Sequence, residues 1–271
     1  MTPLLLLTLG GALLVSSASH ASGACEVRSG ATTAALVELY TSEGCSSCPP
    51  ADRQLSALRR QLDANAVVVP LALHVTYWDR IGWKDIFAQK AFDERQRQLL
   101  EGRRHKIIYT PQFFVNGDEV RDWGARLPAA VRRANAMPAP PAIHLKTTPG
   151  AASSKAGTGP TLLLEAEVSA TDPRTAGALY MAIAESGLVS DVARGENRGA
   201  ILRHDYTARL WLGPFPLAHG KASVHQAVSL PGAWNSERVH AVAFVQGTAD
   251  GRILQAVSTG DCGDASPGSA R

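Results

Sequence analysis

The sequence has 271 residues, with 27 Lys and Arg against 24 Asp and Glu, and a formal net charge of +3 at neutral pH. The basic residues are scattered along the chain without a cluster, which argues against a nucleic-acid partner. The length is sufficient for two domains.

The first segment has the character of a secretory signal peptide, residues 1–21. It carries no Lys, Arg, Asp or Glu, and residues 4–15 form an apolar run that is too short to span a bilayer. Ser19 and Ala21 place small residues at the expected cleavage position. No later segment approaches the length of a membrane span, so we expect a periplasmic or secreted protein without a membrane span after signal cleavage.

The following residues predict a strand, a helix and a second strand. Residues 35–40 form a short apolar run that ends in a turn. Residues 51–62 repeat apolar side chains at helical spacing. Residues 67–75 are almost unbroken apolar sequence, as expected of a parallel strand that is covered on both faces.

A second helix is predicted over residues 84–100. A hairpin is predicted around Asn116-Gly117, the strongest short hairpin signal in the chain, and a last helix over residues 125–134. This order of elements is the minimal thioredoxin-type topology, so the first half of the chain predicts an α/β thioredoxin-like domain.

A change of composition between residues 137 and 160 to Pro, Ala, Gly, Ser and Thr indicates a domain boundary. Beyond it, short strand-like runs separated by turns predict a small antiparallel β-sandwich-like domain. The expected organisation is a signal peptide (1–21), the thioredoxin-like domain (22–137), a linker with a first strand (138–160), a β-rich domain (161–262) and a flexible tail (263–271).

Cys45 and Cys48 form the candidate chemical centre, because they lie two residues apart between the first predicted strand and helix. The partial positive charge of a helix N-terminus stabilises a thiolate, which is the form that attacks disulfides. We therefore expect Cys45 to attack, as the more exposed and more acidic thiol, and Cys48 to resolve the mixed disulfide. Glu43 would oppose thiolate formation if it lay close to the pair.

Thr110-Pro111 stands immediately before the hairpin strand. In thioredoxin-type folds a cis-proline at this position lies against the disulfide and exposes a backbone edge to substrate peptide. Trp78 and Trp83 follow the second strand and either line a substrate groove together with Thr110 or pack beneath a long loop.

Four cysteines allow three connectivities, and two of them, Cys25 and Cys262, lie near the two ends of the mature chain. A disulfide between them leaves Cys45 and Cys48 free for exchange, and closing so long a loop stabilises the fold by ~4 kcal/mol in the chain-entropy model. The alternative is two free thiols, which export disfavours.

Three motifs carry a resemblance to a known family: CSSCPPAD at 45–52, HVTYWD at 74–79 and YTPQ at 109–112. With them, the chain resembles a family of secreted bacterial proteins that have a thioredoxin-like first domain and are catalogued as a domain of unknown function. The resemblance extends into the second half through residues 195–199 and His204. It implies the fold and redox chemistry but no substrate. Thr76 stands where the family usually has an acidic residue.

The leading hypothesis is an exported thiol-disulfide oxidoreductase that acts on protein thiols and is served by a redox partner protein. It needs no cofactor and no bound metal. The alternatives are copper or zinc handling by Cys45 and Cys48 with a nearby His74, and a binding protein without turnover. For His74 itself, core packing is the favoured interpretation.

Overall fold

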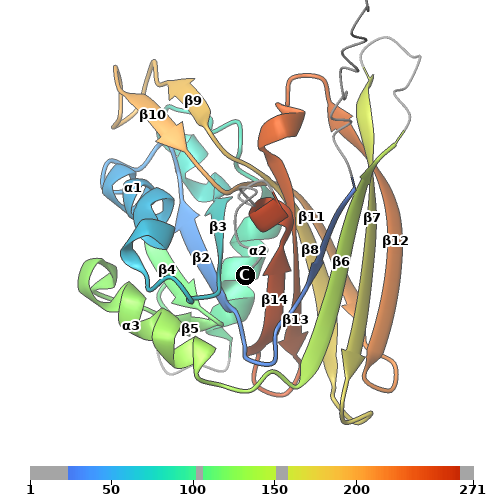
Figure 1. Ribbon diagram of the computed structural model, residues 1–271. Helices are drawn as coiled ribbons and strands as arrows, with labels where there is room; N and C mark the ends of the chain where they lie inside the picture. The colour runs from blue at the N-terminus through green and yellow to red at the C-terminus, as the bar shows by residue number, and fades with distance from the viewer. Residues whose placement is uncertain (1–23, 102–105, 151–157, 263–271) are drawn as a thin grey trace, which may run out of the picture.

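The computed structural model describes residues 24–101, 106–150 and 158–262 (Figure 1). The predicted signal peptide and the predicted tail lie outside the described residues. The helices are α1 (Pro49–Ala57), η1 (Leu58–Gln61), η2 (Thr76–Ile81), α2 (Lys90–Leu100), α3 (Trp123–Asn135), η3 (Ser236–Arg238) and η4 (Thr259–Cys262). The strands are β1 (Cys25–Arg28), β2 (Ala35–Thr41), β3 (Val68–His74), β4 (Gln112–Val115), β5 (Asp118–Glu119), β6 (Pro141–Pro149), β7 (Thr158–Ala170), β8 (Gly177–Glu185), β9 (Leu188–Asp191), β10 (Ile201–His204), β11 (Thr207–Pro216), β12 (Lys221–Pro231), β13 (Val239–Gly247) and β14 (Ile253–Ser258).

One mixed sheet of eight strands runs through both halves of the chain, in the order β14-β13-β8-β11-β3-β2-β4-β5. Strand β3 is parallel to both β2 and β11, and the other pairs are antiparallel. A second sheet has the order β1-β6-β7-β12, and β9 and β10 form a separate two-stranded ribbon. Among the described helices, none has the length and apolar character needed to cross a membrane.

The predicted fold class, an α/β thioredoxin-like domain followed by a small antiparallel β-sandwich-like domain, is wrong. The structure is mostly β, and strands from the two halves share the eight-stranded sheet. The junction lies where Thr207 of β11 pairs with Ala72 of β3, and the Ala72 amide donates to the Tyr206 carbonyl (2.8 Å). Buried backbone groups at a strand edge need partners, and here the second half of the chain supplies them.

The two faces of the large sheet are covered differently (Figure 1). On one face, α1 and α3 pack over Val37 and Leu39 of β2, and the second sheet packs over Met181 and Ile183 of β8. On the other face, α2 buries Phe92 against both halves of the sheet. The alternation of side chains along β2 and β8 therefore builds three apolar clusters from one continuous sheet.

Some predicted elements begin elsewhere in the structure. The helix predicted from residue 84 starts at Lys90, because residues 82–89 form an irregular loop that follows η2. In that loop the Asp85 side chain accepts from the Phe87 amide (2.9 Å). The last helix of the first half begins at Trp123, two residues earlier than predicted. The strand-like runs predicted beyond residue 160 correspond to β7, β8, β13 and β14, whereas β9, β10, β11 and β12 had no predicted counterpart.

The two ends of the described chain are joined by a disulfide. Cys25 at the start of β1 and Cys262 at the end of η4 have Cα atoms 6.0 Å apart. The bond connects the second sheet to the segment that follows β14 at the edge of the large sheet. It closes a loop over nearly the whole described chain.

A buried ion pair joins α2 to the centre of the large sheet. Arg95 is 2% exposed, and its Nε and Nη2 atoms donate to the two carboxylate oxygens of Glu38 (3.0 and 3.1 Å). Its Nη1 atom donates to Gln246. Three aromatic rings from three strands surround the guanidinium at 5.2–5.7 Å: Tyr180, Trp211 and Phe244. Arg95 therefore contacts both halves of the sheet at once.

Replacing Arg95 by Met is expected to lower the free energy of unfolding by about 3–5 kcal/mol, because it leaves the Glu38 carboxylate buried without its partner. Urea denaturation of the purified protein measures this loss. Arg97→Met is the matched control on the same helix, since the Arg97–Glu94 pair lies in solvent and its loss should be undetectable. Equal losses for the two variants would contradict this assignment.

Candidate functional site

Cys45 and Cys48 form a disulfide at the junction of β2 and α1. Their Cα atoms are 5.4 Å apart, and the Cys48 amide donates to the Cys45 carbonyl (3.1 Å). Cys48 is the N-cap of α1, followed by Pro49 and Pro50 in the first turn, where missing N–H groups do little harm. The pair is thus held in a short ring at a helix N-terminus.

Both sulfur-bearing residues are fully covered, while Ser46 and Ser47 between them are exposed. The expectation that Cys45 would be the more exposed cysteine is therefore wrong for this state of the protein. The Ser47 hydroxyl lies 3.4 Å from Cys45 Sγ. An incoming thiolate needs access to a sulfur atom, so attack on this disulfide requires local opening.

The loop between β9 and β10, residues 192–200, lies over the cysteine loop, and we name it the cover segment. Asn197 Nδ2 donates to the carbonyl oxygens of Glu43 (2.8 Å) and Cys45 (2.9 Å). The Glu196 carboxylate accepts from the amide (3.0 Å) and the hydroxyl (2.7 Å) of Ser46, and these bonds lower the pKa of Glu196. The second half of the chain thereby fixes the backbone that carries the disulfide.

A glycine permits this close approach. Gly195 has φ +75°, and a Cβ atom built there would lie 3.1 Å from Trp83 Cβ. Any other residue would have to adopt the left-handed conformation and displace Trp83. Gly195 therefore positions Glu196 and Asn197 above the cysteine loop.

The residues predicted to line a substrate groove lie around the same loop. Pro111 follows a cis peptide bond from Thr110, and the next residue, Gln112, pairs with Tyr40 of β2. Thr110 and Pro111 therefore stand at the end of the sheet from which the cysteine loop departs. Trp78 lies against Gly44, where an added Cβ would be 3.4 Å from Trp78 Cβ. The Trp83 indole donates to Glu43 Oε2 (2.7 Å).

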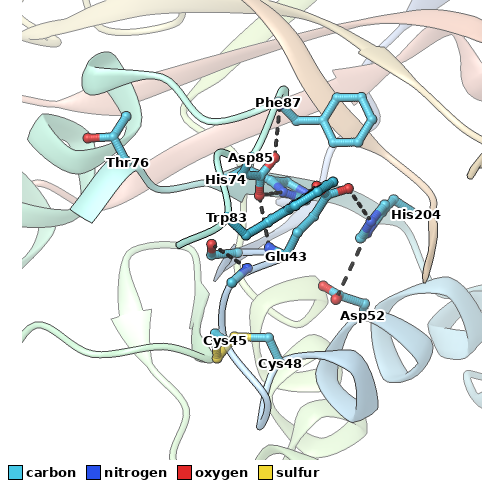
Figure 2. Close-up of polar contacts among 12 residues, drawn as sticks. Glu43, Cys45, Cys48, Asp52, His74, Thr76, Trp83, Asp85, Phe87 and His204 are labelled. Carbon is cyan, nitrogen blue, oxygen red and sulfur yellow. Dashed lines mark hydrogen bonds and ion pairs between the residues drawn. A yellow bond between two sulfur atoms is a disulfide. The ribbon is translucent and has the colours of Figure 1, made fainter. Parts of the chain in front are cut away.

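Beside the disulfide, two buried histidines meet buried carboxylates (Figure 2). His74, the last residue of β3, donates from Nδ1 to Asp85 Oδ2 (2.7 Å), which also accepts from the Glu43 amide (2.9 Å). Burial lowers the pKa of His74, but the Asp85 carboxylate outweighs it and raises that pKa overall. Burial likewise opposes ionisation of Asp85, yet the His74 imidazolium holds its pKa below the usual range. His74 is therefore packed in the interior, as expected, and is paired there with Asp85.

The second histidine, His204, ends β10 and lies between two carboxylates. Its Nε2 atom is 3.3 Å from Glu43 Oε1, and its Nδ1 atom is 3.9 Å from Asp52 Oδ2. The rings of His74 and His204 meet edge to face, with centroids 4.9 Å apart. We call these five residues the acid–histidine cluster: Glu43, Asp52, His74, Asp85 and His204.

Sequence reasoning singled out Glu43 and His74 but missed the roles of Asp52, Asp85 and His204. Asp52 lies one helical turn after Cys48, a spacing that was readable in the sequence. Nothing local signals that His204 and Asp85 reach this point, because each arrives from a distant segment. Thr76, the position that departs from the family pattern, bonds instead to Asp93 in the first turn of α2.

Metal binding by the cysteines would require two thiolates, and here the sulfur atoms are bonded to each other. Across the described part of the chain, no group of three or more His, Cys, Asp or Glu residues is arranged to hold a metal ion.

A family model described as protein of unknown function (DUF1223) matches residues 36–246, which include the disulfide, the cover segment and the acid–histidine cluster. The chain belongs to this family. No functionally curated protein matches it at significant similarity.

Two solved structures are similar to this member of the family. A crystal structure of a protein from Agrobacterium tumefaciens is 24% identical, with a TM-score of 0.58 over 84% of this chain and 94% of that chain. HBP35 of Porphyromonas gingivalis is 17% identical, with a TM-score of 0.64 over 85% of this chain and 76% of that chain. At these identities, both likenesses show the fold alone.

Removing the Asn197 side chain should expose the disulfide. Asn197→Ala deletes two hydrogen bonds of about 1 kcal/mol each, so reduction of Cys45–Cys48 by dithiothreitol should be about 30-fold faster. The measurement is timed alkylation followed by mass spectrometry. Asn235→Ala is the control, since Asn235 caps η3. An unchanged rate in Asn197→Ala would show that the cover segment does not limit access.

Proposed function

We propose that this protein is an exported thiol-disulfide oxidoreductase that exchanges disulfides with protein thiols through Cys45 and Cys48. The observation that carries the proposal is the closed disulfide between two cysteines at the N-terminus of α1, beside buried ionisable groups. Purely structural disulfides seldom lie against a cluster of titratable side chains, whereas perturbed pKa values concentrate at functional sites.

The helix favours the reduced state of the pair. When the disulfide opens, a thiolate at the N-terminus of α1 is stabilised by the partial positive charge of the first turn. The Ala51 and Asp52 amides, which donate to the Cys48 carbonyl (2.8 and 3.1 Å), fix Cys48 against that turn. Glu43 works against a thiolate, but its carboxylate is already engaged by Trp83 and by His204.

The proposed exchange balances as two displacement steps. A substrate thiolate attacks Cys45 Sγ, the bond between Cys45 and Cys48 breaks, and Cys48 leaves as a thiolate. A second thiolate of the substrate then attacks the substrate sulfur atom that is bonded to Cys45. The substrate disulfide forms, and Cys45 leaves as a thiolate. The substrate is oxidised by two electrons and the protein is reduced by two. A partner protein carrying a disulfide restores Cys45–Cys48, and with a disulfide substrate every step runs in reverse.

An oxidising compartment fits the presence of two disulfides, Cys25–Cys262 and Cys45–Cys48, because such bonds persist outside the cytoplasm. Together with the signal-like first 21 residues, this supports a periplasmic or secreted location. The expected partners are protein thiols or disulfides and a redox partner protein.

A second candidate is a binding protein that keeps the pair as a structural bond. The full burial of both Cys45 and Cys48 favours it, since a catalytic disulfide is ordinarily accessible. The two candidates differ in whether covalent intermediates form.

Trapping in the native host separates them. Cys48→Ser should accumulate mixed disulfides between Cys45 and other proteins, because the resolving thiol is missing. Cys45→Ser is the matched control and should accumulate few. Non-reducing electrophoresis and mass spectrometry detect and identify the adducts. The absence of adducts in both variants would contradict the proposed function, and adducts only in Cys45→Ser would exchange the two roles.

A further inference from the structure

The acid–histidine cluster holds five ionisable side chains out of solvent next to the disulfide, and each comes from a different element (Figure 2). Glu43 follows β2, Asp52 is in α1, His74 ends β3, Asp85 follows η2 and His204 ends β10. Phe87 closes one side, with its ring centroid 5.4 Å from His74 and 5.7 Å from His204. Arg209, which lies over Phe87, is itself paired with Glu185.

Some of the buried polar atoms in this cluster lack hydrogen-bond partners. Several buried polar atoms have no hydrogen-bond partner among the described residues: Glu43 Oε1, Asp52 Oδ1, His74 Nε2, and both ring nitrogens of His204. Unpaired buried polar atoms destabilise a fold by about 1–3 kcal/mol each. Their concentration at one place beside a disulfide indicates a role in the chemistry there.

The charges of the cluster do not balance if every group ionises. His74 and Asp85 form one complete ion pair, and His204 lies at ion-pair distance from Glu43. Asp52 remains as the third carboxyl for two imidazoles. Burial raises the pKa of Asp52, and the charge interaction with His204 offsets part of that effect. Asp52 is therefore the group that can change its proton with least disturbance to the others.

Asp52 is also the member of the cluster that lies on α1, the helix capped by the resolving cysteine. It lies four residues after Cys48 on α1, and its amide donates to the Cys48 carbonyl (3.1 Å). Residues at this spacing have neighbouring side chains on the same helix face. Figure 2 shows Cys48 and Asp52 on the same part of α1, with His204 above Asp52.

We propose, as a refinement that rests on the proposed redox function, that Asp52 accepts the proton of the Cys48 thiol, and that His204 is the positioning residue that keeps Asp52 ready for it. In this step a substrate sulfur is bonded to Cys45. The Cys48 proton moves to the Asp52 carboxylate, and the Cys48 thiolate attacks Cys45 Sγ. The bond between Cys45 and the substrate sulfur breaks, and the substrate leaves as a thiolate.

His204 matters because Asp52 can accept a proton only while it is ionised. Burial raises the pKa of Asp52 and the charge interaction with His204 lowers it, so loss of His204 should shift Asp52 toward the protonated form, which cannot accept a proton. In this proposal the second half of the chain takes part in the proton transfer, because β10 brings His204 to α1. The adjoining cover segment holds the cysteine loop.

The test follows ring closure in the reduced full-length mature protein. The reagent is an aromatic disulfide whose thiol is coloured, observed by stopped-flow absorbance. The first release of coloured thiol depends on reagent concentration, and the second does not, because it reports attack by Cys48. In Asp52→Asn and His204→Gln the second release should be at least about tenfold slower at pH 6–7, within the range of general base catalysis.

The pH profile distinguishes proton transfer from structural damage. Above the ordinary thiol pKa of about 8.5, solvent removes the proton, so the rates of both variants should converge with that of the natural protein. His240→Gln is the matched control, because burial and then Arg59 lower the pKa of His240 to about 4 and keep it neutral. It should leave the profile unchanged.

The alternatives give distinct results. If the natural protein shows the second release but Asp52→Asn and His204→Gln keep its pH profile, or are slower by one factor at every pH, the proton-transfer proposal is overturned. If the natural protein shows no second release, the redox function itself fails. Circular dichroism identifies variants that do not fold, and either folded variant alone decides the question.

Discussion

The pairing of Arg95 with Glu38 is the interaction on which the rest of the structure depends. A guanidinium in a dry interior is tolerable only with a carboxylate and further acceptors around it, and here these come from both halves of the chain. Glu38 belongs to β2, which leads into the cysteine loop, whereas Gln246 and two of the surrounding aromatic rings belong to β8 and β13. The pair therefore requires the two halves to form one sheet.

Continuity of the sheet explains how the site is assembled. Once β11 lies beside β3, the segment just before it brings His204 and the β9–β10 ribbon over the N-terminus of α1. The cover segment then reaches the cysteine loop through Glu196 and Asn197. A first half folded alone would lack the cover and one histidine of the cluster. We infer that the second half is part of the chemical site and not only an attached domain.

Sequence reasoning reached the local features and missed the long-range ones. The strand before the cysteines, the first helix and the Asn116-Gly117 hairpin follow from apolar periodicity and turn residues, and the structure contains them. The separate thioredoxin-like and sandwich-like domains were wrong, because an apolar strand such as β3 shows that its faces are buried but not which strand fills its edge.

The same limit applies to the candidate site. Cys45, Cys48 and Pro111 stand out through spacing and neighbouring residues, since their geometry is set within a few positions. Asp85 does not, and His204 does so only through the family resemblance, because their significance arises from tertiary contacts with Glu43 and His74. The family resemblance includes residues 195–199, but only the contacts of Glu196 with Ser46 show that the segment covers the disulfide.

The central claim is that Cys45–Cys48 is a reversible couple within a fold whose other disulfide is fixed. Equilibrating the purified mature protein in a series of glutathione buffers, followed by acid quenching, alkylation and peptide mass mapping, tests it most directly. The account predicts a two-electron transition at Cys45 and Cys48 while Cys25–Cys262 remains oxidised and the protein stays folded. A Cys45–Cys48 bond that remains closed in every buffer, including fully reduced glutathione, while the protein stays folded would contradict it.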